Sequence, residues 1–305
     1  LAGSLAAGGL GKHSQDELAS ILAGRSVSFE LTSSIDAFTA SATTTPRDLA
    51  LQLQVLAATL TDPGYRPEGV ERVRKNIDNF FDTLTSTPAR ALGAASGAIL
   101  SNNDPRFSLQ SREAFFALDY AQLRAVIDDR LARGAIEIAL VGDLDEDAAI
   151  AAVAATLGTL SPREEAFNPR EENRTRSFTA ARGERRLTHT GEPDQALLQW
   201  VWPTTDDSDL AEDQRLDLLA RIVRLELTDR LREKLGQAYS PSAGSSTSNI
   251  YPGYGTFTVS ASVAADAVDA ARGAVAGLIA DLRAGPLDPD LIERARKPLL
   301  EEYNN

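Results

Sequence analysis

Two short segments of this sequence occur twice, in the same order and at nearly the same spacing. Residues 38–43 (FTASAT) match residues 257–262 (FTVSAS) at an offset of 219, and residues 70–75 (VERVRK) match residues 292–297 (IERARK) at an offset of 222. In both copies the intervening pattern is that of an amphipathic helix followed by a Pro/Gly turn. Ordered matches at a nearly constant offset indicate duplication, so the chain is predicted to hold about one and a half copies of a unit of roughly 220 residues.

The first copy is expected to begin with a helix, a β-rich stretch and a second helix. Ser14 and Glu17 have the spacing of a capping box, which predicts a helix over 14–24. A β-rich stretch over 27–44 then leads into a helix that opens at residues 45–46 (TP) and ends at a DPG turn. The stripe of leucines that predicts this second helix consists of Leu49, Leu53, Leu56 and Leu60.

Further along, the pattern predicts more helices, a buried strand and a linker. Helical segments are expected from about 67 to 132, and the apolar run 136–141 predicts a buried strand that ends at Gly142. Residues 161–184 contain two prolines, many charges and few large apolar side chains, which is typical of a linker. The predicted organisation is therefore a first unit over 1–160, the linker, and a second unit over 185–305.

The second unit repeats the pattern of the first and adds to it. A β-rich stretch over 185–203 precedes a long helix from Asp209 to Gly236, and both come before the strands and helices that match the first copy. No counterpart of this β-rich stretch occurs ahead of residue 1, and residues 76–160 have none after residue 305. The sequence is therefore expected to begin and end inside a copy. It also contains no methionine, which indicates an internal piece of a longer polypeptide or a sequence from which the methionines are missing.

Composition excludes several classes of function. A net charge of −13 argues against a nucleic-acid partner, because binding phosphates needs clustered lysine and arginine. No apolar run is long enough to predict a membrane span. The absence of cysteine excludes a disulfide scaffold and a thiol nucleophile. It also suits an oxidising compartment, so a soluble protein of the periplasm or cell envelope is expected.

Four segments together resemble one enzyme family. Residues 231–239 (LREKLGQAY), with Arg232 and Tyr239 seven apart, are similar to a segment at the end of a long helix in the pitrilysin, insulin-degrading enzyme and mitochondrial processing peptidase family. Residues 139–144 (ALVGDL) resemble that family's strand-ending turn. Residues 8–12 (GGLGK), with the helix after them, resemble the non-catalytic half of its long bacterial members, and residues 257–263 resemble a strand of the same half.

The resemblance implies an α+β fold. Each unit would be a mainly antiparallel sheet with helices packed on one face, and two halves would close over a peptide substrate. In this family an H-x-x-E-H helix supplies zinc ligands and the general base. This chain has only His13 and His189, and neither lies in that motif. No zinc site is therefore expected in this chain, and zinc would belong to a partner half, either fused upstream or a separate subunit.

Arg232 and Tyr239 are the candidate catalytic residues. The family resemblance implies that they reach across to the active site of the zinc-bearing half, where a guanidinium and a phenol can donate hydrogen bonds to a developing oxyanion. From spacing alone, a structural role is favoured, with Arg232 complementing a helix C-terminus and Tyr239 packing in a strand. The predicted function is that of the non-catalytic half of a zinc metalloendopeptidase. This half alone is expected to be inactive. The alternative is a scaffold or binding subunit of the same fold that has lost catalysis.

Overall fold

The chain forms two compact units in a computed structural model that describes residues 2–28, 30–235 and 241–304. The first unit comprises Leu1–Phe81 and Gln110–Pro169, and the second comprises Asp82–Leu109 and Arg170–Asn305. The domain bounds expected from the sequence stay a prediction.

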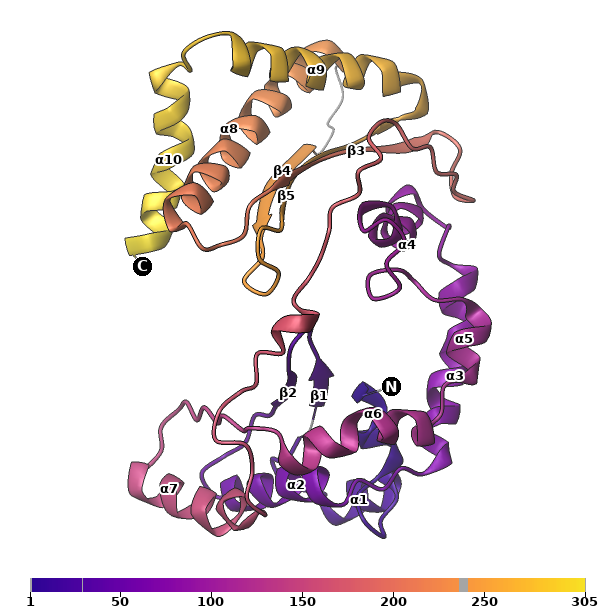
Figure 1. Ribbon diagram of the computed structural model, residues 1–305, viewed down its shortest axis with the longest axis vertical. Helices are drawn as coiled ribbons and strands as arrows, with labels where there is room; N and C mark the ends of the chain where they lie inside the picture. The colour runs from indigo at the N-terminus through magenta and orange to yellow at the C-terminus, as the bar shows by residue number, and fades with distance from the viewer. Residues whose placement is uncertain (1, 29, 236–240, 305) are drawn as a thin grey trace. The chain divides into compact units, whose positions relative to one another are not determined.

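The first unit contains a two-stranded sheet and a group of helices (Figure 1). Strands β1 and β2 pair antiparallel, with Leu31 opposite Ala40. The small core beneath them contains Leu5, Leu31, Ile127 and Leu131. The elements of this unit are η1 (Ala2–Ser4), η2 (Ala6–Gly8), α1 (Gln15–Ile21), β1 (Glu30–Ser33), β2 (Phe38–Ser41), α2 (Leu49–Thr61), α3 (Pro67–Asp82), α5 (Arg112–Ala117), α6 (Tyr120–Arg133), α7 (Glu146–Ala155) and η3 (Leu157–Thr159).

The second unit is built on a three-stranded antiparallel sheet in the order β3–β5–β4. Alternate residues of β5 are buried, as expected for a sheet covered on one face. These residues join Leu227, Leu231, Val275 and Leu278 of the helices in one core. The elements are α4 (Pro88–Leu100), η4 (Glu171–Asn173), β3 (Gln195–Thr204), α8 (Leu210–Leu235), β4 (Pro241–Thr247), β5 (Gly255–Ala264), η5 (Ala265–Ala267), α9 (Val268–Ala284) and α10 (Pro289–Asn304). The expected α+β class, with helices packed on an antiparallel sheet, is confirmed.

The two units contain the same run of elements. In the first unit β1 and β2 are followed by α2 and α3, and in the second β4 and β5 are followed by α9 and α10. Pro67 and Pro289, at the offset of 222, each begin the second helix of their pair. Leu5 and Leu227, at the same offset, are 1% and 0% exposed. These correspondences support the predicted duplication, whose direct test is superposition of the two copies.

Helix ends follow the local signals in the sequence. The Ser14 hydroxyl accepts a hydrogen bond from the Glu17 nitrogen, and the Glu17 carboxylate accepts one from the Ser14 nitrogen, so the predicted capping box is confirmed. Helix α2 ends at Thr61, directly before the DPG turn. It begins at Leu49 rather than at residues 45–46, because a turn closed by the Asp48 nitrogen and the Thr45 carbonyl comes first.

One prediction about strands is confirmed and one is wrong. The β-rich stretch 27–44 contains a short hairpin, in which residues 34–37 connect β1 and β2. Residues 136–141 do not form a buried strand. Ile136, Ile138 and Leu140 are each 37% exposed, and Val141 is 97% exposed. A strand requires a hydrogen-bonded neighbour, and no segment in the described part of the chain pairs with this one.

Candidate functional site

The candidate site lies where α8 ends and β4 begins. Leu227 and Leu231, one helical turn apart, are 0% and 1% exposed and fasten the last turns of α8 to the sheet of the second unit. At the other end of the segment, Ala243 of β4 packs against the same core. Helix α8 and strand β4 therefore both pack into the core of the second unit.

The two predicted catalytic residues belong to this segment. Arg232 follows Leu231 in the last turns of α8, but its side chain lies outside the described residues. Tyr239 lies outside them entirely, within residues 236–240. The predicted roles of Arg232 and Tyr239 stay a prediction.

Arg230, the last arginine of α8 with a described side chain, has a structural role. Its guanidinium donates to the Asp281 carboxylate of α9 at 2.8 Å and to the Glu226 carboxylate at 3.4 Å. The bond to Asp281 joins α8 to α9, and the bond to Glu226 lies within α8. Arg230 therefore serves as a control arginine in the same helix, because its guanidinium is engaged within the second unit.

The two histidines lie in different units, and each makes a local contact. His13 is partly exposed, with its Nδ1 atom 3.7 Å from the Glu17 carboxylate. The His189 Nε2 atom lies 3.0 Å from the Gln195 carbonyl. Among the described residues, no three histidine, aspartate or glutamate side chains gather closely enough to hold a metal ion. These residues therefore do not fit the zinc site of a peptidase.

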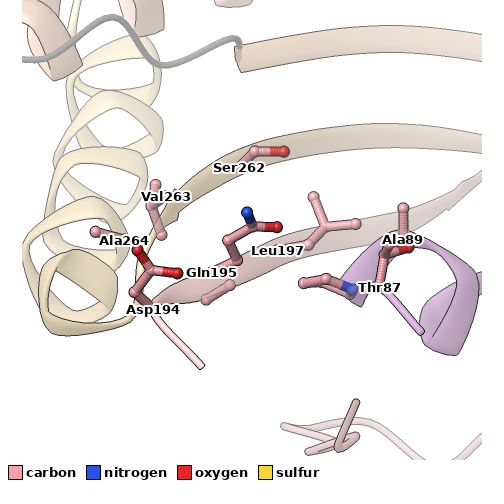
Figure 2. A pocket seen from close by; sticks show the side chains of 10 residues that line it. Thr87, Ala89, Asp194, Gln195, Leu197, Ser262, Val263 and Ala264 are labelled. Atoms are coloured by element: carbon pink, nitrogen blue, oxygen red, sulfur yellow. The ribbon is translucent and has the colours of Figure 1, made fainter. Parts of the chain in front are cut away.

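A pocket of about 370 Å³ lies in the second unit, between the first turn of α4 and the ends of β3 and β5. Figure 2 shows the side chains of Gln195, Leu197 and Ser262 gathered beside this turn. Among the described residues that line it, Asp194 alone is ionisable. Thr87 caps α4, because its hydroxyl accepts a hydrogen bond from the Arg90 nitrogen. The pocket has the size of a small ligand site but holds no acid–base pair or nucleophile.

The second half of the predicted linker is packed rather than loose, a feature that the sequence analysis missed. The Arg176 guanidinium lies 4.0 Å from the ring centre of Phe107 and 4.2 Å from that of Tyr254, which are cation–π distances. Arg106 donates to the carbonyls of Asn173 and Thr175 at 3.1 and 2.7 Å. These contacts join residues 173–176 to the second unit.

The same contacts explain the glycines around Tyr254. Gly253 has a φ of 68°, which a glycine adopts readily, and lies in the loop between β4 and β5. Gly255 begins β5. The pair therefore shapes the hairpin loop between β4 and β5. The signal that could have predicted the cluster is the spacing of aromatic residues around this loop.

Comparison with known proteins identifies the family. A model of the peptidase M16 inactive domain matches residues 117–299, more than half of the sequence. No curated protein sequence matches significantly. Among the helices of the described ranges, none is long and apolar enough to cross a membrane.

Solved structures share the fold at low sequence identity. A peptidase M16 inactive domain from Pseudomonas fluorescens is 17% identical, with a TM-score of 0.73 over 100% of this chain and 73% of that one. The periplasmic protease PqqL from Escherichia coli is 15% identical, with a TM-score of 0.66 over 100% of this chain and 35% of that one. Pitrilysin is 17% identical, with a TM-score of 0.61 over 95% of this chain and 32% of that one. This chain therefore spans about a third of the length of PqqL and of pitrilysin.

The match of the family model includes α8 and the candidate site at its end. The chain belongs to the peptidase M16 inactive-domain family, the non-catalytic half of the pitrilysin-like zinc peptidases.

Proposed function

We propose that this chain completes the peptide-binding chamber of a zinc metalloendopeptidase and donates Arg232 and Tyr239 to the active site of the zinc-bearing half. The observation that carries the proposal is the family match, which spans the end of α8 where the pair lies. Zinc and the general base come from the partner half. The contribution of this chain is hydrogen-bond donation and enclosure of the peptide.

The framework of the site suits that role. A donor to a developing oxyanion is effective only when it is held in place before the reaction. Leu227 and Leu231 fix the helix immediately before Arg232 in a core that excludes solvent.

The test is kinetic and uses the assembled two-half protein. Arg232→Ala and Tyr239→Phe are expected to lower kcat by about 10²–10³, with zinc content unchanged, because each removes one donor to the oxyanion. Arg230→Ala is the matched control, since it removes a guanidinium from the same helix without removing a proposed donor. It is expected to lower the melting temperature and leave kcat per folded molecule unchanged.

The competing function is that of a scaffold or binding subunit. Unchanged kcat in both Arg232→Ala and Tyr239→Phe would reject the donor role and favour this reading. A fall in melting temperature as large as that of Arg230→Ala, with kcat retained, would also favour the scaffold role. The two functions therefore predict different effects of the same variants on kcat.

We also propose a periplasmic or cell-envelope location. The support is the absence of cysteine and the fold shared with PqqL, which is described as a periplasmic protease. Fractionation of the source cells tests this location, and recovery of the protein in the cytoplasmic fraction would reject it.

A further inference from the structure

The pocket beside α4 lies on the face of the second unit's sheet that points away from the core. Ala196 and Leu198 of β3 pack against the core, so Leu197 between them points to the opposite face. Ser262 of β5 lies opposite Leu197 and shares this face. Both residues line the pocket, and the first turn of α4 forms its other wall. The pocket is therefore a hollow between the open face of the sheet and a helix of the same unit.

Main-chain contacts hold this helical wall in place. The Thr190 nitrogen, a few residues before β3, donates to the Thr85 carbonyl at 2.7 Å, just ahead of α4. A carbon added at Gly191 would lie 2.2 Å from the Ser86 carbonyl oxygen, so the two segments approach as closely as a glycine permits. The segments that lead into α4 and β3 are thus joined directly, and the pocket between these elements is formed before any ligand arrives.

The lining combines apolar surface with a single carboxylate. Figure 2 shows Asp194 at one end of the pocket and the first turn of α4 at the other. The side chains of Pro88, Ala89 and Leu197 supply apolar surface along the lining. The Asp194 carbonyl accepts a hydrogen bond from the Ala265 nitrogen at 2.8 Å, but no group among the described residues pairs with its carboxylate. The pocket therefore offers an unpaired negative charge beside apolar surface.

These features select one class of ligand. An anion is disfavoured, because Asp194 repels it. The helix end does not compensate, since Pro88 has no N–H and the Thr87 hydroxyl already accepts from the Arg90 nitrogen. A lysine or arginine side chain has an aliphatic stem that packs on apolar surface and a cationic head for the carboxylate. The charge and the lining together therefore fit a basic side chain.

The position of the pocket relates it to the candidate site. Strand β4 starts at Pro241, two residues after Tyr239 in the sequence, and Pro241 pairs with Ala261 of β5. The next residue of β5, Ser262, lines the pocket. An extended peptide advances about 3.3 Å per residue. A peptide held at the start of β4 therefore reaches the pocket within a few residues.

We propose that this pocket is a subsite for a lysine or arginine side chain of the peptide substrate, with Asp194 as the counter-ion and Leu197 as the floor. The inference rests on the proposed function and assigns its substrate class, peptides with a basic residue a few positions from the cleaved bond. Asp194 is exposed, so solvent screens the ion pair. A basic side chain should therefore be favoured over an apolar one of similar length by about threefold to fivefold.

The first test measures peptide binding without catalysis. It uses the assembled two-half protein after treatment with a metal chelator, so that no peptide is cleaved. The probes are fluorescein-labelled alanine–glutamine peptides with lysine at one position at a time, and a matching set with norleucine. At one position, fluorescence anisotropy should show that lysine binds about threefold to fivefold more tightly than norleucine. Equal affinities for lysine and norleucine at every position would overturn the proposal.

Matched variants assign the preference to one carboxylate. Asp194→Asn should abolish the preference for lysine and leave the affinity for the norleucine peptide unchanged. Glu192→Gln removes the same charge two residues earlier, outside the pocket lining, and should keep the preference. Asp194→Lys should instead favour glutamate at the same peptide position. Loss of the preference in both Asp194→Asn and Glu192→Gln, or in neither, would contradict the assignment to Asp194.

Kinetics separate this subsite from the proposed donor role. In the active assembled protein, Asp194→Asn should raise KM for the lysine peptide about threefold to fivefold and leave kcat unchanged. If Arg232→Ala and Tyr239→Phe leave kcat unchanged while the lysine preference is present, the donor role fails and the subsite stands. If those two variants lower kcat while Asp194→Asn alters neither KM nor the binding preference, the subsite is rejected and the donor role stands.

Discussion

Replacement of Leu227 by alanine should destabilise the second unit selectively. Leu227 is 0% exposed and lies at the centre of the core that joins α8 to the sheet. Truncation of a fully buried leucine costs 2–5 kcal/mol, and about 3 kcal/mol is expected where the surrounding sheet cannot collapse into the cavity. With a urea m-value of about 2 kcal/mol/M, the unfolding midpoint should fall by about 1.5 M.

The chain provides its own reporter for this measurement. Both tryptophans, Trp200 and Trp202, lie in β3, so tryptophan fluorescence follows unfolding of the second unit. Leu210→Ala is the control in the same helix. Its side chain is 65% exposed, and a shift within about 0.25 M is expected. If Leu227→Ala shifted the midpoint by no more than this control, the assignment of Leu227 to the centre of the core would be wrong.

Two further predictions concern the first unit. The pKa of Asp48, held at about 2 by hydrogen bonds from Arg47 and the Ser26 nitrogen, lies below its usual 3.8. Ionised Asp48 therefore stabilises the fold above about pH 4, and this stabilisation is lost as the pH falls toward 2. In the Asp48→Asn variant, the free energy of unfolding should depend less on pH over this range, as followed by circular dichroism during acid unfolding. Gly69→Ala should cost about 1–3 kcal/mol, because the added carbon would overlap the Tyr120 hydroxyl and lie 2.9 Å from the Gly8 nitrogen. Tyr120→Phe in the same chain should restore part of that loss in thermal melts, and simple additivity of the two changes would contradict this account.

Local signals in the sequence predicted local structure well. The capping box at Ser14 and the DPG stop after α2 act through hydrogen bonds and backbone limits within a few residues, so they need no knowledge of the tertiary fold. The repeat added long-range information, since matched offsets predicted the same order of strand, helix, turn and second helix in both copies. The reliable predictions were those that rested on hydrogen bonds and backbone limits within a few residues.

Predictions that depend on distant partners were less successful. The run 136–141 has the composition of a buried strand, but burial needs a neighbouring strand that no described segment supplies. The composition of the 161–184 segment gives no sign that Arg176 packs between the rings of Phe107 and Tyr254, which lie 69 and 78 residues away in the sequence. Neither partner can be read from the segment itself. The candidate pair Arg232 and Tyr239 came from family resemblance, because spacing alone favoured a structural role.

The duplication also bears on which of the two copies can supply a hydrogen-bond donor to an active site. At the offset of 222, Leu227 corresponds to Leu5, and both side chains are buried. At the same offset, Arg232 corresponds to Leu10, which has no polar side-chain group. The two copies therefore share a buried leucine before this position, but only the second carries a guanidinium after it. A guanidinium that served only to complete the repeated framework would be expected in both copies, so its presence in the second copy alone favours the proposed role as a donor.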